Sequence, residues 1–264
     1  MAEFLMNATI PADSLPNQSL MPRKFPRFLF HLMALGGLFL SACGPSNTEA
    51  TCQSQAELYS FRFDSNSELK AFRAEVEGYP DAVRVIDGRL DIDAPRGATL
   101  WFARKLTAPL EIAYTATVVD AGGPNDRVSD LNCFFMAIDP LCPSDVLACP
   151  DSLRTGRFPD YHRLRTYYVG YGGHDNTTTR MRRYPGYSGE RPVLPGHDLG
   201  APHLLQPNSP VRIRIRVEDS TVRYWHDDAL IFEMNDSLPY HEGWFAFRTV
   251  RNHMQVDDLV ITSL

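Results

Sequence analysis

The segment from Arg165 to Gly186, RTYYVGYGGHDNTTTRMRRYPG, concentrates side chains that could recognise and process a saccharide. Arginine carries a planar guanidinium that binds a carboxylate or sulfate through two parallel hydrogen bonds. Tyrosine offers a flat ring for packing against a sugar and a hydroxyl for bonding to its oxygens. Histidine exchanges protons near neutral pH. Together these residue types favour an acidic sugar as the ligand of this segment.

The positive charge of the chain is local. The sequence has 23 arginines and only 3 lysines, and its net charge is −6. Eight of the arginines lie between Arg154 and Arg191, where only three acidic residues accompany them. A chain that is acidic overall does not have the charge of a general polyanion binder, so we expect no nucleic-acid partner. The clustered arginines instead favour an acidic oligosaccharide or polysaccharide.

β-Elimination on a uronic acid sugar is the reaction that this composition favours most. It requires a cation beside the sugar carboxylate, a base for the neighbouring proton and an acid for the leaving oxygen. We assign Arg180 to the carboxylate, and Tyr168 and His253 to the proton transfers. The same groups would serve a dehydratase. The residues expected to bind the substrate are Asp130, Asn132, Tyr171, His174, Asn176, Arg182, Tyr184 and Arg248.

Two other functions remain open. A glycoside hydrolase needs two carboxylates across the scissile bond, and the sequence offers only isolated candidates such as Asp130 and Asp160 rather than an E-x-D-x-x-E triplet. A non-catalytic protein could use the same aromatic and basic side chains to hold glycans at the cell surface. The sequence lacks the close CxxC spacing that is typical of a zinc site. We therefore assign no metal ligand and no cofactor.

These side chains need a sheet to position them. Alternation in Val211–Val217, with apolar residues on one face and arginines on the other, predicts a half-buried strand. The segments 165–172 and 177–184 predict a hairpin that turns at Gly-His-Asp-Asn, with Tyr168 on the face opposite Tyr171. The one helix expected is short, around 67–75. Closely spaced strands separated by Gly, Pro, Asn and Asp predict an all-β sandwich or jelly roll.

The N-terminus reads as an export signal rather than as part of the fold. Residues 1–20 precede Met21, which is a plausible translation start. A cationic segment is then followed by 13 apolar residues, 28–40, too few for a permanent membrane span. Leu-Ser-Ala-Cys resembles a bacterial lipobox, and that resemblance implies cleavage before Cys43 and acylation of its thiol. We therefore expect a signal peptide at 1–42, a lipidated cysteine and tether at 43–56, and one jelly-roll domain at 57–264. The protein would be an outer-membrane or periplasmic lipoprotein, held to the membrane by its N-terminal lipid.

Four further cysteines suit an exported protein with disulfides. Cys142 and Cys149 flank a proline-containing loop and are the easiest pair to join. A bridge between Cys52 and Cys133 is the other pairing that the sequence leaves open.

Several motifs resemble an uncharacterised concanavalin A-like jelly-roll family of bacterial polysaccharide-utilisation loci, with YesU-like relatives associated with pectin breakdown. The motifs are DRVSDLNCFFMAIDP, YYVGYGGHDNTTTRMRRYPG, RPVLPGHD with HLLQPN, and GWFAFRTVRNHMQVDDLVI. The resemblance covers roughly 60–264 and implies a jelly roll with a concave ligand-binding sheet, in which a structural calcium ion would not be unusual. In that family asparagine often occupies the position of His174.

Overall fold

The computed structural model describes residues 56–187 and 189–264. These residues belong to a compact unit that spans 51–264. The predicted signal peptide, the lipidation site Cys43 and the tether as far as residue 55 lie outside the described residues. Within the described part of the chain, no helix has the length and apolar character needed to cross a membrane.

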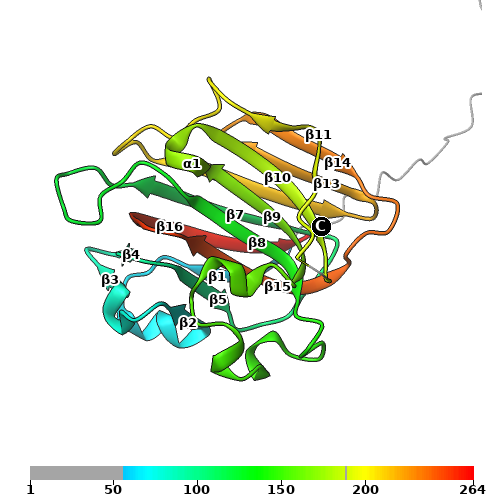
Figure 1. The fold of residues 1–264 in the computed structure, drawn as a ribbon, viewed down its shortest axis with the longest axis horizontal. Helices are drawn as coiled ribbons and strands as arrows, with labels where there is room; N and C mark the ends of the chain where they lie inside the picture. The colour runs from blue at the N-terminus through cyan, green and yellow to red at the C-terminus, as the bar shows by residue number, and fades with distance from the viewer. Residues whose placement is uncertain (1–55, 188) are drawn as a thin grey trace, which may run out of the picture. The chain divides into compact units, whose positions relative to one another are not determined.

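The described chain is a β-sandwich of two antiparallel sheets, as the sequence predicts (Figure 1). The first sheet contains, in spatial order, β14 (Ala229–Asn235), β13 (Thr221–His226), β12 (Val211–Glu218), β7 (Leu110–Val118), β16 (Asn252–Ser263), β4 (Arg89–Ala94) and β3 (Val83–Ile86), and β1 (Glu57–Phe61) pairs with β16.

The second sheet carries the tyrosine- and arginine-rich segment 165–186. Its strands, in spatial order, are β11 (Val193–Leu199), β10 (Thr178–Pro185), β9 (Arg165–Gly172), β8 (Leu131–Ile138), β15 (Glu242–Thr249), β5 (Ala98–Phe102) and β2 (Phe72–Val76), and β6 (Leu106–Thr107) pairs with β15. The helical segments are short: η1 (Asn66–Ala71), η2 (Pro80–Ala82), η3 (Val146–Ala148), η4 (Asp151–Leu153), η5 (Phe158–Tyr161) and α1 (Gly173–Asn176). The helix predicted at 67–75 is present only in its first half, as η1. The second half of that segment is the strand β2.

The main hydrophobic core lies between the two sheets. The apolar side chains at Val211, Ile213, Ile215 and Val217 are buried, which confirms the period-two prediction for β12. Tyr114 on β7 packs its ring against aromatic side chains of β15 on the opposite sheet. Each fully buried side chain of this size contributes about 1.5–3 kcal/mol of transfer free energy, so the alternation fixes which face of β12 turns inward.

The predicted hairpin is also present. Strands β9 and β10 pair in the register Gly170–Arg180 and Tyr168–Arg182, and α1 joins them at one end of the sheet (Figure 1). As the alternation requires, Tyr171 turns into the inter-sheet core whereas Tyr168 lies on the outward face of the second sheet.

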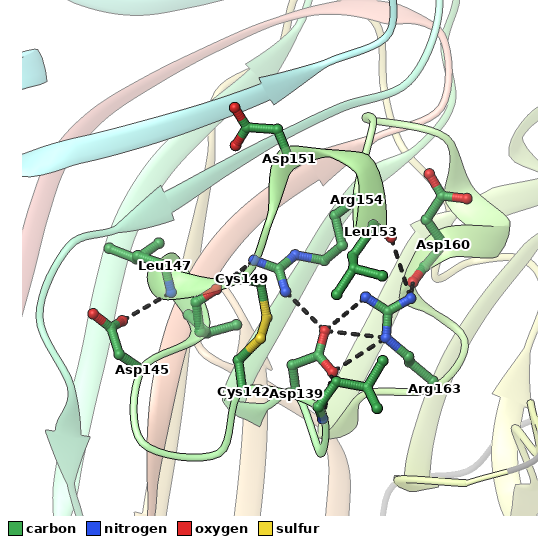
Figure 2. The surroundings of a disulfide bond; sticks show 12 residues. Asp139, Cys142, Asp145, Leu147, Cys149, Asp151, Leu153, Arg154, Asp160 and Arg163 are labelled. Atoms are coloured by element: carbon green, nitrogen blue, oxygen red, sulfur yellow. Dashed lines mark hydrogen bonds and ion pairs between the residues drawn. A yellow bond between two sulfur atoms is a disulfide. The ribbon is translucent and has the colours of Figure 1, made fainter.

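A covering loop, 139–164, lies over part of that outward face. It buries a second apolar cluster that includes Trp101, Phe134 and Trp244. The predicted Cys142–Cys149 disulfide closes the loop (Figure 2). Cys133 is a free thiol buried in the core, so it does not form the alternative bridge to Cys52, a residue outside the described part.

Buried ion pairs fix the covering loop to the sheet. Figure 2 shows the Asp139 carboxylate between the guanidinium groups of Arg154 and Arg163, each with an N–O distance of 2.8 Å. Arg154 also pairs with Glu75 of β2 at 2.9 Å, and Glu75 accepts a 2.8 Å bond from the Tyr161 hydroxyl. Because these charges are buried and mutually paired, the loop is held in one place.

Candidate functional site

Two rows of cross-strand neighbours position the candidate site on the outward face. One row runs through Asn132, Gly170 and Arg180 on β8, β9 and β10. The adjacent row runs through Phe134, Tyr168 and Arg182 on the same strands. Alternation along β9 and β10 therefore brings two tyrosines, Tyr168 and Tyr184, and two arginines of the sequence motif to the same surface.

The β9 and β10 members of these rows, Tyr168, Gly170, Arg180 and Arg182, line a pocket of about 630 Å³. Six residues assigned to the site from the sequence line it: Asp130, Tyr168, His174, Arg180, Arg182 and Tyr184. The remaining lining residues are Arg127, Phe158, Gly170, Gly173, Asp175, Thr178, Arg191 and Val250. Four arginines and two aspartates surround the space, so the lining has an excess of positive charge.

Aromatic rings make one wall of the pocket. The ring of Tyr168 lies 5.6 Å from that of Tyr184 and 5.7 Å from that of Phe158, between centroids. A side chain at Gly170 would meet the Tyr168 ring and hydroxyl at 3.1 Å, so glycine allows this ring to lie along the strand. Burial raises the pKa of Tyr168 well above its usual value and that of Tyr184 to about 12. Both hydroxyls are therefore protonated at neutral pH and can act as donors.

Arg182 and Arg191 supply positive charge without a paired acid. The Arg182 guanidinium donates through Nη1 to the carbonyl of Arg191. Burial lowers the pKa of Arg182, and the charges of Arg180 and Arg191 lower it further. No carboxylate in the described residues forms an ion pair with Arg182 or Arg191, whereas Arg180 pairs through Nε with Asp198 at 2.7 Å. Arg182 and Arg191 are thus the residues most ready to accept an anionic ligand.

One arginine holds both acidic residues of the pocket. Arg127 donates from Nη1 to Asp130 and from Nε to Asp175, with both distances 2.7 Å. Burial alone would lower the pKa of Arg127, but the bonds to these two carboxylates raise it. Asn132 also donates to Asp130, at 3.3 Å, from beneath the pocket floor. The two carboxylates consequently lie close together on one side of the pocket.

His174 occupies a strained turn at the end of the hairpin. The φ angles of His174, Asp175 and Asn176 are 53°, 56° and 58°, in the left-handed region that most side chains avoid. The Nε2 atom of His174 lies 3.1 Å from Nη1 of Arg180. Arginine can only donate, so this contact assigns the acceptor role to Nε2 and the proton of the neutral ring to Nδ1. Strain of this kind often marks a functional position.

The structure does not bring the other assigned residues to the pocket surface. Tyr171 is only 1% exposed, and its hydroxyl bonds to Nδ1 of His226 at 2.7 Å across the inter-sheet core. Asn176 uses its carboxamide to bond both the backbone N–H and the carbonyl of Leu205, each at 2.9 Å. Asn132 and Arg248 are on the outward face but are buried beneath the lining.

His253 lies on the other sheet. Its Nε2 is 2.8 Å from Asp91 and its Nδ1 is 3.0 Å from Asp126. The hydrogen bond to Asp91, and then that to Asp126, raise the pKa of His253 to about 8. Only five positions separate His253 from Arg248 in the sequence. The two residues nevertheless lie on different sheets, because Arg248 belongs to β15 and His253 to β16. His253 therefore cannot be the proton-transfer partner of Tyr168 in this arrangement.

Four important lining residues were not assigned from the sequence: Arg127, Phe158, Asp175 and Arg191. Arg127 belongs to the motif DRVSD, Asp175 to the hairpin turn and Arg191 to the arginine cluster, so each had a visible signal. Phe158 had none, because the covering loop brings it in from outside the sheet. Other arginines of the cluster are structural: Arg165 and Arg183, for example, pack on the ring of Tyr240.

Candidate metal-ligating side chains are dispersed in the residues that the structure covers. No group of three or more histidine, cysteine, aspartate or glutamate side chains is arranged there to hold an ion. The carboxylates nearest the pocket are already occupied by Arg127.

The fold and the pocket define an antiparallel β-sandwich of the galectin-like, concanavalin-like class, with a basic and aromatic cavity on one sheet. Within that class, the chain belongs to the family described as "Domain of unknown function (DUF6250)", whose family model matches residues 92–259. The narrower relationship to YesU-like proteins stays a prediction. The search of curated proteins found no match.

Solved structures with a similar fold are distant in sequence. A Bacillus subtilis protein of unknown function with a galectin-like fold is 19% identical, with a TM-score of 0.63 over 78% of this chain and 95% of that one. The carbohydrate recognition domain of Emp47p is 13% identical, with a TM-score of 0.54 over 79% and 96%. The endo-β-1,3-glucanase from Pyrococcus furiosus is 11% identical, with a TM-score of 0.52 over 79% and 94%. At these identities the likeness establishes the fold.

Proposed function

We propose that the pocket binds acidic saccharides and that the protein is a carbon–oxygen lyase or dehydratase acting on uronic acid-containing chains. One observation carries the proposal: Arg182 and Arg191 have no carboxylate partner in the described residues, and they stand beside an aromatic wall. A sugar carboxylate would supply the missing counter-charge, while the ring of Phe158 or Tyr168 would pack against the sugar face. Similar folds in a carbohydrate recognition domain and a glucanase are consistent with a saccharide ligand.

The elimination can be assigned to groups that line the pocket. Arg182 and Arg191 would bind the carboxylate and stabilise the negative charge that develops when the neighbouring C–H bond breaks. Tyr168, which is protonated, would donate its proton to the oxygen that leaves from the adjacent carbon. The electron pair of the broken C–H bond then forms the new carbon–carbon double bond, which is conjugated with the carboxylate.

His174 is the proton acceptor that this pocket offers. Its Nε2 lone pair accepts a hydrogen bond from Arg180 in the free protein. A substrate carboxylate that draws the Arg180 guanidinium away would release this lone pair for the sugar proton. Base activation would then depend on substrate binding, and His174 would take the role that the sequence had given to His253.

Hydrolysis is less well supported by the arrangement of carboxylates. Ordinary glycoside hydrolysis places one carboxyl group on each side of the scissile bond. Asp130 and Asp175 are instead bound by the same guanidinium, that of Arg127. Non-catalytic binding uses the same contacts as the lyase and differs only in the fate of the substrate.

An absorbance assay tests the proposal. Incubation with pectic and ulvan-type polysaccharides, and with their oligosaccharides, should raise the ultraviolet absorbance of an unsaturated uronate. We expect Tyr168→Phe to abolish this rise while retaining saccharide binding, and Tyr171→Phe, which alters a core hydroxyl, to leave it intact. Tight binding with no absorbance change in the wild-type protein would identify a binding module, and neither binding nor turnover would refute the proposal.

The cellular setting is part of the proposal. Export and acylation at Cys43 would place the pocket where extracellular polysaccharide fragments arrive. Growth with a labelled fatty acid should label the wild-type protein but not Cys43→Ser, and labelling of that variant would contradict acylation at Cys43.

A further inference from the structure

Arg248 is a buried cation whose hydrogen bonds are incomplete. This β15 residue is 0% exposed. Its Nη1 donates to Oγ1 of Thr99 at 2.8 Å and to the carbonyl of Gly156 at 2.6 Å. Its Nε and Nη2 have no hydrogen-bond partner among the described residues. Leaving a buried donor unpaired is unfavourable, and more so when the donor is charged, so the arrangement needs a physical explanation.

The same region neutralises another buried arginine completely. Arg154 is equally enclosed and forms ion pairs with Glu75 and Asp139 at 2.9 and 2.8 Å. Arg248 forms no ion pair with any carboxylate in the described part of the chain, and burial lowers the pKa of Arg248. Burying an unpaired charge is strongly unfavourable. This contrast between Arg154 and Arg248 indicates that the anionic partner of Arg248 is a bound ligand rather than a side chain of the sheet.

The unpaired atoms match the functional groups of a uronic acid sugar. Nε and the adjacent Nη2 form one edge of the guanidinium, which can bind both oxygens of a carboxylate in parallel. Asn132 is the cross-strand neighbour of Arg248, and its buried Oδ1 also has no partner in the described residues. A carboxamide oxygen accepts hydrogen bonds, for example from a sugar hydroxyl. Adjacent strands thus offer donors for a carboxylate and an acceptor for a hydroxyl.

Phe158 touches both the pocket and the guanidinium of Arg248, which the ring of Tyr161 also covers, at 4.8 Å from Cζ. Phe158 lines the pocket, and its ring centroid is 5.3 Å from Cζ of Arg248. The same ring lies 5.9 Å from Cζ of Arg191 and packs edge-on against His162 at 5.0 Å. The Nε2 atom of His162 is likewise buried without a partner in the described residues. Phe158 begins η5, a single turn of the covering loop, so its ring is held by packing rather than by a sheet.

We propose that Phe158 is a gate and that Arg248, with Asn132, forms an inner carboxylate-binding subsite behind it. The placement of that carboxylate on a saccharide rests on the proposed function. Rotation of the ring would expose the Nε and Nη2 edge to the pocket, while Arg182 and Arg191 would bind a second carboxylate at the mouth. An inner subsite closed by the covering loop accommodates the end of a chain, so the ligand class is a saccharide with a terminal uronic acid.

Chemical labelling tests the gate without any saccharide. Phenylglyoxal modifies accessible guanidinium groups, and peptide mass spectrometry would measure the modification rate of Arg248. In the wild-type protein we expect slow modification. In Phe158→Ala we expect a rate at least tenfold higher, reduced about tenfold by acetate but not by chloride at the same ionic strength. Arg154 serves as an internal control, because its modification stays slow only while the covering loop remains folded.

The outcomes separate this inference from the proposed function. Acetate protection of Arg248 supports a carboxylate subsite even if the protein eliminates no saccharide. Modification of Arg248 that is insensitive to acetate, or unchanged by removal of the Phe158 ring, would overturn the inference. If Arg154 becomes reactive in Phe158→Ala, the loop has unfolded, and Phe158→Leu, which keeps an apolar side chain at this position, replaces it. The same two results then decide: the modification rate of Arg248 relative to the wild-type protein, and its protection by acetate.

Discussion

Replacing His253 with glutamine should remove a clear pH dependence from the stability of the protein. His253 bridges Asp91 and Asp126 with both ring nitrogens, at 2.8 and 3.0 Å, and both nitrogens can donate only when the ring is protonated. These bonds raise its pKa from 6.5 to about 8. A shift of that size corresponds to about 2 kcal/mol of unfolding free energy.

The sign of the effect follows from the direction of the shift. The pKa of His253 is higher in the folded than in the unfolded protein, so its stabilisation is complete below about pH 6.5 and is lost as the pH rises through about 8. The pKa values of Asp91 and Asp126 are lowered, so their contributions are lost only in acid. Arg84, which bonds Asp91 and Asp93, keeps its charge throughout the range tested.

Urea unfolding at pH 6, 7, 8 and 9 measures this contribution. We expect the wild-type protein to lose about 2 kcal/mol more than His253→Gln between pH 6 and 9. The comparison is made as a difference because burial lowers the pKa of His162 to about 4, which changes stability in the opposite direction in both proteins. His241→Gln is the matched control, because His241 is exposed and should keep the wild-type profile. Equal pH dependence in the wild-type and His253→Gln proteins would refute the assignment of this ion-pair bridge.

Three further predictions follow from buried contacts. Glu75→Gln should destabilise the protein by about 3–5 kcal/mol in denaturant unfolding, because it leaves the Arg154 charge partly unpaired; a change below about 1 kcal/mol would contradict the network. Tyr171→Phe should cost about 1 kcal/mol of stability and leave saccharide affinity unchanged, whereas a loss of affinity would place the ligand elsewhere. Gly170→Ala should weaken saccharide binding severalfold in calorimetry, because its Cβ meets the Tyr168 ring at 3.1 Å; wild-type affinity would show that this ring does not touch the ligand.

Local patterns were enough to predict the sandwich and the hairpin. Alternation in Val211–Val217 reports directly which side chains face the core. Along β9 the same geometry only places successive residues on opposite faces, because a strand turns neighbouring side chains to opposite sides. The same rule already separated Tyr168 from Tyr171. The Cys142–Cys149 disulfide could also be predicted from local sequence, because a short loop joins the two cysteines.

Partnerships between distant segments could not be predicted in this way. Arg248 and His253 look adjacent in sequence, yet one lies under the covering loop and the other bridges two aspartates on the opposite sheet. The positions of Phe158 and Arg127 depend on where long connections return to the sheet. Which arginines are neutralised is also a tertiary property: Arg154 finds two carboxylates, and Arg182 finds none in the described residues.

The most direct test of the acidic-saccharide pocket is calorimetric binding of a uronate trisaccharide and of its methyl ester, which keeps the sugar rings but removes the charge. Hydrogen bonds to a charged group contribute about 1.5–3 kcal/mol, or roughly 10- to 150-fold in affinity. We predict that the wild-type protein prefers the free acid by at least tenfold and that Arg182→Met combined with Arg191→Met removes the preference. Equal affinity of the wild-type protein for the acid and the ester would contradict the account.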